Sequence, residues 1–196
     1  GASGVPIPDA KYIATAYANY VSRDFTTTNI SGLFTPEGLY PITGVKDLTL
    51  NISVDRGLTI LNSKLTGPNA ATRPVTVFGY SQGATAGSIA MAQLAHDGVD
   101  PALLHFVFIG DPTAPDGKYP SIEDDGSAHT NFSDTWMLYG KQTPNDAFPT
   151  TIYTIPGDPN ADHTSTSPYG DFYEHMMYLG LTPDQVANHT ATVDGM

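Results

Sequence analysis

The 196-residue sequence contains no cysteine, one tryptophan and only eight lysine and arginine residues. The absence of cysteine excludes disulfide bonds, thiolate metal sites and a cysteine nucleophile. Twenty acidic residues give a formal net charge of −12, so nucleic acid and anionic membranes are unfavourable partners. No apolar run approaches the roughly 18 residues that a helix needs to cross a bilayer. This composition is compatible with a globular protein that binds an uncharged small molecule.

The length suits a single domain, and apolar residues make up 40% of the chain, enough for a substantial core. We therefore expect residues 1–196 to form one domain, and we expect a monomer. The chain begins with Gly1 and not with methionine, so we expect that an amino-terminal segment has been removed. Such a segment could have included an export signal.

Two periodicities alternate along the chain. Helical spacing of apolar residues predicts helices at residues 9–21, 48–65 and 82–96. Runs of β-branched or apolar residues predict strands at residues 74–79, 104–109 and 150–155. A stretch rich in Pro, Gly, Asp and Ser, residues 111–149, is too polar for the core and is interpreted as an excursion or lid. The order of elements predicts a three-layer α/β/α sandwich with a mostly parallel sheet.

The segment Gly-Tyr-Ser-Gln-Gly at residues 79–83 lies between a predicted strand and a predicted helix. It fits the Gly-x-Ser-x-Gly nucleophile elbow, in which small residues allow a sharp turn that exposes one serine hydroxyl. We interpret Ser81 as a nucleophile, with the main-chain N–H of Gln82 directed at developing negative charge. The alternative is a tight strand–helix turn in which the serine only caps the helix.

A serine nucleophile needs a base and an acid that orients the base, and in this fold class the chain order is serine, acid, histidine. The acid is expected at the carboxyl end of a later strand. Asp158 follows the predicted strand at residues 150–155 and is the first candidate, Asp162 is the second, and Asp111 is the third.

Six histidines compete for the role of the base. His175 follows the candidate acids and lies among apolar residues that could hold an imidazole at the edge of a cleft, so we favour it. An ordinary surface histidine on a helix is the alternative. The remaining histidines fit helix-end, core, loop or tail positions better: His96, His105, His129, His163 and His189.

A second oxyanion donor is expected from a loop that follows an early strand. The Gly-Ala-Ser-Gly start of the chain fits such a loop, and Ser3 could contribute its amide and its hydroxyl. The strand that would precede this loop is not part of the sequence.

Several blocks of the chain together resemble a known family. They are "GASGVPIPDAKYIATAYANYV", "LFTPEGLYPITGVKDLTL", "VTVFGYSQGAT", "FVFIGDP", "FPTTIYTIPGD" and "YEHMMYLGLTPDQ". These blocks resemble the mycobacterial PE-PPE domain, and the elbow is also similar to that of cutinases. The resemblance implies a cutinase-like α/β-hydrolase in which Ser81, His175 and Asp158 are catalytic, with Asp162 as an alternative acid.

The resemblance also implies a serine esterase or lipase that acts on carboxylic esters, in a secreted protein or in the cell envelope. The expected partner is a small-molecule or lipid ester, with contact at a lipid interface, and no metal or organic cofactor is expected. One alternative is an acyltransferase that passes acyl groups to trehalose-type alcohols. Another is an inactive module that binds lipid or glycan.

Overall fold

A computed structural model describes residues 1–23, 25–27, 29–68, 70–117, 147–162, 164 and 170–188. Most of the predicted excursion, residues 118–146, lies outside these residues, so the interpretation as a lid stays a prediction. Three of the competing histidines also lie outside them, namely His129, His163 and His189.

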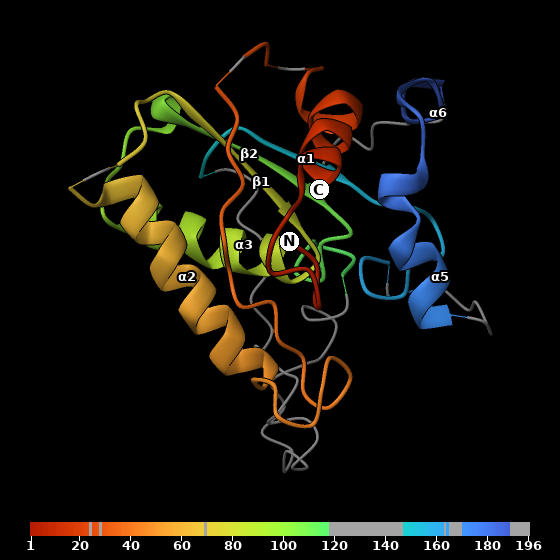
Figure 1. Ribbon diagram of the computed structural model, residues 1–196. Coiled ribbons are helices and arrows are strands. Elements are labelled where there is room, and N and C mark those ends of the chain that lie inside the picture. The colour runs from red at the N-terminus through yellow and green to blue at the C-terminus, as the bar shows by residue number, and fades with distance from the viewer. Residues whose placement is uncertain are drawn as a thin grey trace.

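The described strands form one parallel sheet in the order β1-β2-β3. The strands are β1 (Val75–Tyr80), β2 (Leu104–Ile109) and β3 (Thr150–Tyr153). Val75 pairs with Leu104, and Phe106 pairs with Thr150. All three strands therefore end at the same edge of the sheet, which is where the chain turns toward the candidate site residues (Figure 1).

Helical elements surround this sheet. They are α1 (Ala10–Ala16), the π-helix η1 (Tyr17–Val21), α2 (Leu50–Thr66), α3 (Gln82–His96), the 3-10 helix η2 (Pro101–Leu103), α5 (Gly170–Met176), the 3-10 helix η3 (Tyr178–Gly180) and α6 (Pro183–Asn188). In the described part of the chain, no helix combines the length and the apolar character that spanning a bilayer requires.

The central strand β2 divides its side chains between two cores, as a strand covered on both faces must. Phe106 and Phe108 face a core that α2 and α3 complete. Val107 and Ile109 face a second core that includes residues of η1, η3 and α6. The predicted α/β fold is therefore confirmed, with helices over both faces of a parallel sheet.

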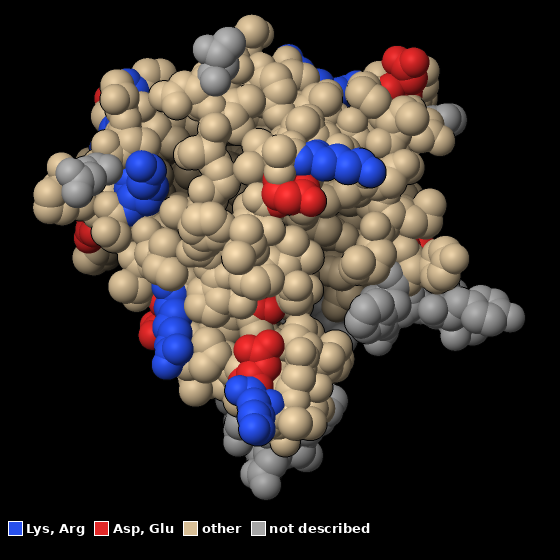
Figure 2. Space-filling view, viewed as in Figure 1, with Lys and Arg blue, Asp and Glu red and all other residues tan. Residues whose placement is uncertain are grey.

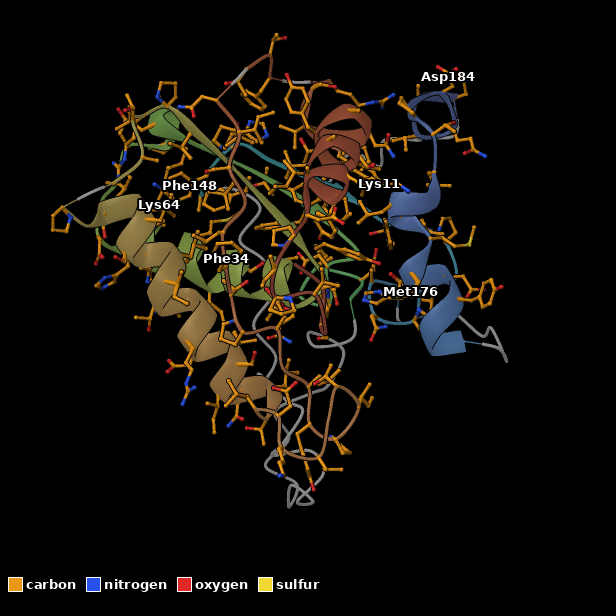
Figure 3. The ribbon with its side chains drawn as sticks, in the orientation of Figure 1. Lys11, Phe34, Lys64, Phe148, Met176 and Asp184 are labelled. Atoms are coloured by element: carbon orange, nitrogen blue, oxygen red, sulfur yellow. The ribbon has the colours of Figure 1, made fainter. Side chains whose placement is uncertain are left out.

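Phe148 closes the first core at the start of β3. Phe148 lies just before β3, is only 3% exposed and packs its ring 5.6 Å from the ring of Phe106 (Figure 3). Figure 2 shows few charged side chains on a largely uncharged face, and several of them are acidic and basic residues side by side. This surface agrees with a chain in which charged residues are only 14% of the total.

The predicted helix at residues 9–21 is present, but it changes geometry after Ala16. A π-helical turn holds one extra residue, so Asn19, Tyr20 and Val21 are all buried in succession. The Asn19 side chain donates to the carbonyl of Leu181 at 2.7 Å, and the Tyr20 hydroxyl donates to the carbonyl of Tyr178 at 2.6 Å. The π-helix thus anchors the carboxyl-terminal segment that carries the candidate base.

Candidate active site

The elbow holds Ser81 in a backbone conformation that residues other than glycine rarely adopt, with φ 54° and ψ −115°. The N–H of Ser81 donates to the carbonyl of Ile109 at the end of β2, at 3.1 Å. Ser81 directly precedes α3, a helix of 15 residues. Strand pairing on one side and the helix start on the other therefore fix the position of the hydroxyl.

The glycines of the elbow are required by close backbone contacts. A Cβ on Gly79 would lie 2.8 Å from the backbone of Ala84, and a Cβ on Gly83 would lie 2.9 Å from the backbone of Gly1. One turn later, a Cβ on Gly87 would lie 2.6 Å from the ring of Phe108. Because these contacts are tighter than real Cβ atoms show, glycine lets α3 pack this close to the sheet and to the amino-terminal residues.

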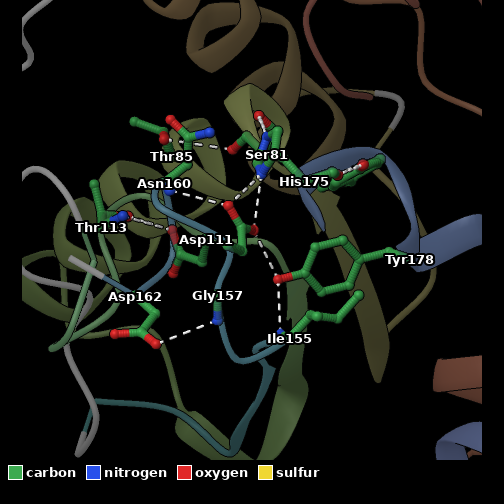
Figure 4. Close-up of polar contacts among 12 residues, drawn as sticks. Ser81, Thr85, Asp111, Thr113, Ile155, Gly157, Asn160, Asp162, His175 and Tyr178 are labelled. Atoms are coloured by element: carbon green, nitrogen blue, oxygen red, sulfur yellow. Dashed lines mark hydrogen bonds and ion pairs between the residues drawn. The ribbon is translucent and has the colours of Figure 1, made fainter. Parts of the chain in front are cut away.

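The structure brings Ser81, His175 and Asp158 together (Figure 4). Nε2 of His175 lies 2.7 Å from Oγ of Ser81. Nδ1 of the same ring lies 2.8 Å from Oδ2 and 3.0 Å from Oδ1 of Asp158. The three side chains come from the elbow, the loop after β3 and α5, and together they form one continuous hydrogen-bonded chain.

Asp158 is completely buried, and donors surround its carboxylate. Besides His175, the main-chain N–H of Asn160 donates to Oδ1 at 2.9 Å and the Tyr178 hydroxyl donates to Oδ2 at 2.8 Å. Burial by itself would raise the pKa of Asp158, but the hydrogen bonds and the adjacent imidazole hold that pKa below its usual value. The carboxylate is therefore ionised at neutral pH.

The other candidate acids have different partners. Asp111 is also completely buried, and its Oδ1 accepts from the N–H of Thr113 at 2.9 Å and from the hydroxyl of Thr113 at 2.6 Å. Asp162 lies one turn after Asp158 and accepts from the N–H of Thr164 at 3.1 Å. Both side chains stabilise turns, as aspartates often do after a strand.

Two competing histidines have positions that the structure describes. His96 is at the end of α3, where its ring is 89% exposed beside Asp97. The ring of His105, in β2, packs edge-on against Phe25 with 4.2 Å between centroids. Neither environment resembles that of His175.

Gln82 and Ser3, the two residues predicted to supply oxyanion donors, are joined by a side-chain hydrogen bond. Gln82 is the first residue of α3, so its main-chain N–H has no partner within the helix. Its side-chain amide donates to Oγ of Ser3 at 2.8 Å and to the carbonyl of Gly38 at 3.0 Å, and it accepts from the hydroxyl of Ser53 at 2.5 Å. Because Oγ of Ser3 accepts from Gln82, the hydroxyl proton of Ser3 is directed elsewhere.

Sequence reasoning gave no hydrogen-bonding role to two tyrosines at this site. Tyr80 donates a short hydrogen bond to the carbonyl of His175, and its ring centroid lies 5.6 Å from that of the imidazole. Tyr178 contacts Asp158, as described above. The position of Tyr80 inside the elbow motif could have indicated a role, but no sequence pattern joins Tyr178 to Asp158.

Among the described residues, no group of three or more His, Cys, Asp or Glu side chains is placed to hold a metal ion.

The sequence profile of the PE-PPE domain matches residues 26–167, which is more than half of the chain. The chain belongs to the PE-PPE domain family. The resemblance drawn from the sequence blocks is thus confirmed, and the cutinase-like α/β-hydrolase fold of the family agrees with the layers described above. No solved structure matches the chain.

Three relatives of this PE-PPE domain come from Mycobacterium tuberculosis. The uncharacterized PPE family protein PPE28 is 39% identical over 95% of this chain and 30% of its own length. The protein named Esterase PE16 is 32% identical over 96% of this chain and 37% of its own length. The uncharacterized PPE family protein PPE42 is 30% identical over 92% of this chain and 32% of its own length. The chain therefore spans about a third of the length of these curated relatives.

Proposed function

We propose that this PE-PPE domain is a carboxylic ester hydrolase in which Ser81 is the nucleophile, His175 the general base and Asp158 the acid. The continuous hydrogen-bonded chain from Oγ of Ser81 through the imidazole to Asp158 carries the proposal. The name of the relative Esterase PE16 supports the same reaction class.

The reaction proceeds in two steps. Nε2 of His175 takes the hydroxyl proton as Oγ of Ser81 attacks the ester carbonyl, and the ionised Asp158 stabilises the imidazolium that forms. The imidazolium then gives its proton to the departing alcohol, which leaves an acyl-serine. Water, deprotonated by the same imidazole, cleaves the acyl-serine and releases the acid.

Negative charge on the carbonyl oxygen is stabilised at the start of α3. The N–H of Gln82 and the hydroxyl of Ser3 are the donors, and the positive end of the helix dipole adds to their effect. The glycines at positions 79 and 83 let the helix start come close enough for this arrangement.

The surroundings of His175 favour an apolar acyl group. Tyr173, Met176 and Met177 are neighbours of His175 in the sequence, and they are 77%, 56% and 44% exposed. Exposed apolar side chains beside a reactive group are typical of sites that bind apolar substrates. The substrate class we propose is therefore an ester with an alkyl acyl chain, taken from solution or from a lipid interface.

Hydrolysis of p-nitrophenyl esters with acyl chains of increasing length tests the proposal. Replacement of Ser81→Ala is expected to lower kcat by on the order of 10⁴-fold or more, because it removes the nucleophile. A fluorophosphonate probe should modify the wild-type chain once, at Ser81, as Oγ displaces fluoride, and should leave the Ser81→Ala variant unmodified.

The matched control is Ser63→Ala, which removes the hydroxyl of an exposed serine on α2. It should retain wild-type turnover and full labelling. Turnover in Ser81→Ala equal to that of the wild type would refute the proposal. Adding trehalose to the assay tests for acyl transfer, because a new ester would then form at the expense of the free acid.

A further inference from the structure

Tyr178 is a buried residue whose hydroxyl has two partners, and their arrangement fixes the direction of its proton. The side chain is 1% exposed. The main-chain N–H of Ile155 donates to the hydroxyl oxygen at 3.0 Å, and the hydroxyl lies 2.8 Å from Oδ2 of Asp158 (Figure 4). Because the oxygen already accepts from Ile155, the phenolic proton points at the carboxylate.

The oxygen that accepts this proton is the one closest to the imidazole. Oδ2 of Asp158 lies 2.8 Å both from Nδ1 of His175 and from the Tyr178 hydroxyl. The carboxylate therefore has two donors on Oδ2, while the N–H of Asn160 donates to Oδ1. With donors on both oxygens, the carboxylate cannot rotate without losing a hydrogen bond to a charged group.

Tyr178 also belongs to the segment that carries the histidine. It follows His175 by three residues, and its own carbonyl accepts from Tyr20 at 2.6 Å. The carbonyl of His175 accepts from Tyr80. The hydroxyl of Tyr178 thus connects the segment that carries His175 to the loop that carries Asp158. These two parts of the chain belong to different secondary-structure elements.

The phenol of Tyr178 is protonated at neutral pH and therefore acts as a donor there. Burial raises the pKa of Tyr178, and the negative charge of Asp158 raises it further. The hydroxyl therefore takes no part in proton transfer and acts only by where it directs its hydrogen bond.

We propose that Tyr178 is a positioning residue that holds Asp158 in the orientation in which its carboxylate engages Nδ1 of His175. This role rests on the proposed function, since it concerns the same three side chains. Tyr178 does not touch the substrate, so its loss should affect turnover and leave substrate binding unchanged.

The test is Tyr178→Phe, which removes the hydroxyl and keeps the ring. We expect kcat for a p-nitrophenyl ester to fall between about tenfold and a hundredfold, the range for losing one hydrogen bond to a charged group. KM should stay within twofold. The matched control is Tyr17→Phe, because the Tyr17 hydroxyl also accepts from a main-chain N–H, that of Thr27, and lies outside the site. This control should retain the wild-type kcat.

A double substitution separates positioning from a general loss of structure. If Tyr178 acts through Asp158, then Tyr178→Phe should lower kcat by less than twofold when Asp158 is already replaced by alanine. An effect of equal size in both backgrounds would overturn the proposal, and so would an unchanged kcat in the folded single variant.

A second measurement does not depend on the Phe variant being folded. The Nδ1 proton of His175 should give a low-field proton resonance in the wild-type chain. Site-specific replacement of Tyr178 by 3-fluorotyrosine keeps the hydroxyl and makes it a stronger donor, so the resonance should shift. The same replacement at Tyr17 should leave it in place, and a resonance unmoved by the change at Tyr178 would refute the role. The esterase proposal is tested separately by Ser81→Ala. If turnover survives that substitution, the esterase proposal fails, whatever the Tyr178 variants show.

Discussion

At the scale of single residues, the main chain and the side chain of Gln82 both belong to the proposed oxyanion site. Its N–H is the first of α3, and its side-chain amide fixes the hydroxyl of Ser3. The sequence motif predicts the first contribution, because it is a property of the elbow backbone. It does not predict the second, which depends on contacts with residues that are distant in the chain, Gly38 and Ser53.

We expect Ser3→Ala to lower kcat by about 10²-fold with little change in KM, the effect of losing one oxyanion donor. The donor acts on charge that exists only in the transition state, so ground-state binding is spared. Steady-state kinetics with a p-nitrophenyl ester measure both constants. Ser22→Ala, which removes a helix-end hydroxyl bonded to the carbonyl of Ala18, is the control and should match the wild type. An unchanged kcat in Ser3→Ala would show that the Ser3 hydroxyl is not an oxyanion donor.

The choice among the three aspartates shows the limit of sequence reasoning at this scale. Asp158 and Asp162 are four residues apart, and both follow β3, so their positions rank Asp158 first without excluding Asp162. The separation is geometric: the N–H of Asp162 donates to the carbonyl of Asp158 at 2.7 Å, which starts a turn that directs the two side chains differently. The contact of Tyr178 with Asp158 spans 20 residues and likewise has no local signature.

At the scale of elements, the strands and the long helices could be predicted closely. The helix at 82–96 and the strand at 104–109 have the predicted bounds. A run of small helix-forming residues marks the helix, and an unbroken apolar run marks the strand. The third strand ends at Tyr153, two residues before the prediction. Ile155 is apolar like a strand residue, but its N–H binds the Tyr178 hydroxyl and so leaves the ladder.

The packing of α3 on the sheet leads to a prediction for Gly79. We expect Gly79→Ala to lower the free energy of unfolding by about 1–3 kcal/mol, because the new methyl group meets the backbone of Ala84 and cannot be relieved by a rotamer change. Turnover should fall as well, since α3 has to move away from the elbow. Urea denaturation monitored by circular dichroism measures the change.

Gly180→Ala is the matched control for that experiment. Gly180 ends η3, and a Cβ there would have nothing within 4 Å. Its free energy of unfolding should stay within about 0.5 kcal/mol of the wild type. Equal effects at the two glycines would show that close packing at the elbow is not the cause.

At the scale of the whole molecule, the two cores meet at the site. The core of α2 and α3 sets the position of the elbow, and the core of η1, η3 and α6 sets the position of His175. The central strand β2 contributes fully buried side chains to both cores, Phe106 and Phe108 to one and Val107 and Ile109 to the other. A strand buried on both faces, visible in the sequence as an unbroken apolar run, therefore links the core beside the elbow to the core beside His175.

Because Asp158 is buried between these parts, its ionisation is coupled to the stability of the fold. Its pKa is lowered in the folded state, so its charge stabilises the protein above the unfolded value of about 3.9, and this contribution is lost as the pH falls through the folded pKa. We expect Asp158→Asn to lower the free energy of unfolding at neutral pH by about 1–3 kcal/mol, because an amide cannot accept from all the donors around it. The difference from the wild type should shrink as the pH falls below about 4.

Urea unfolding of both chains, measured between about pH 3 and pH 8, tests this coupling. Asp184→Asn, at an exposed position on α6, is the control and should differ little from the wild type (Figure 3). A difference for Asp158→Asn that stays constant down to the lowest pH would contradict the coupling, because the wild type would then lose nothing when the carboxylate is protonated. The expected convergence would instead mean that the donors which orient Asp158 toward His175 also contribute to the stability of the fold.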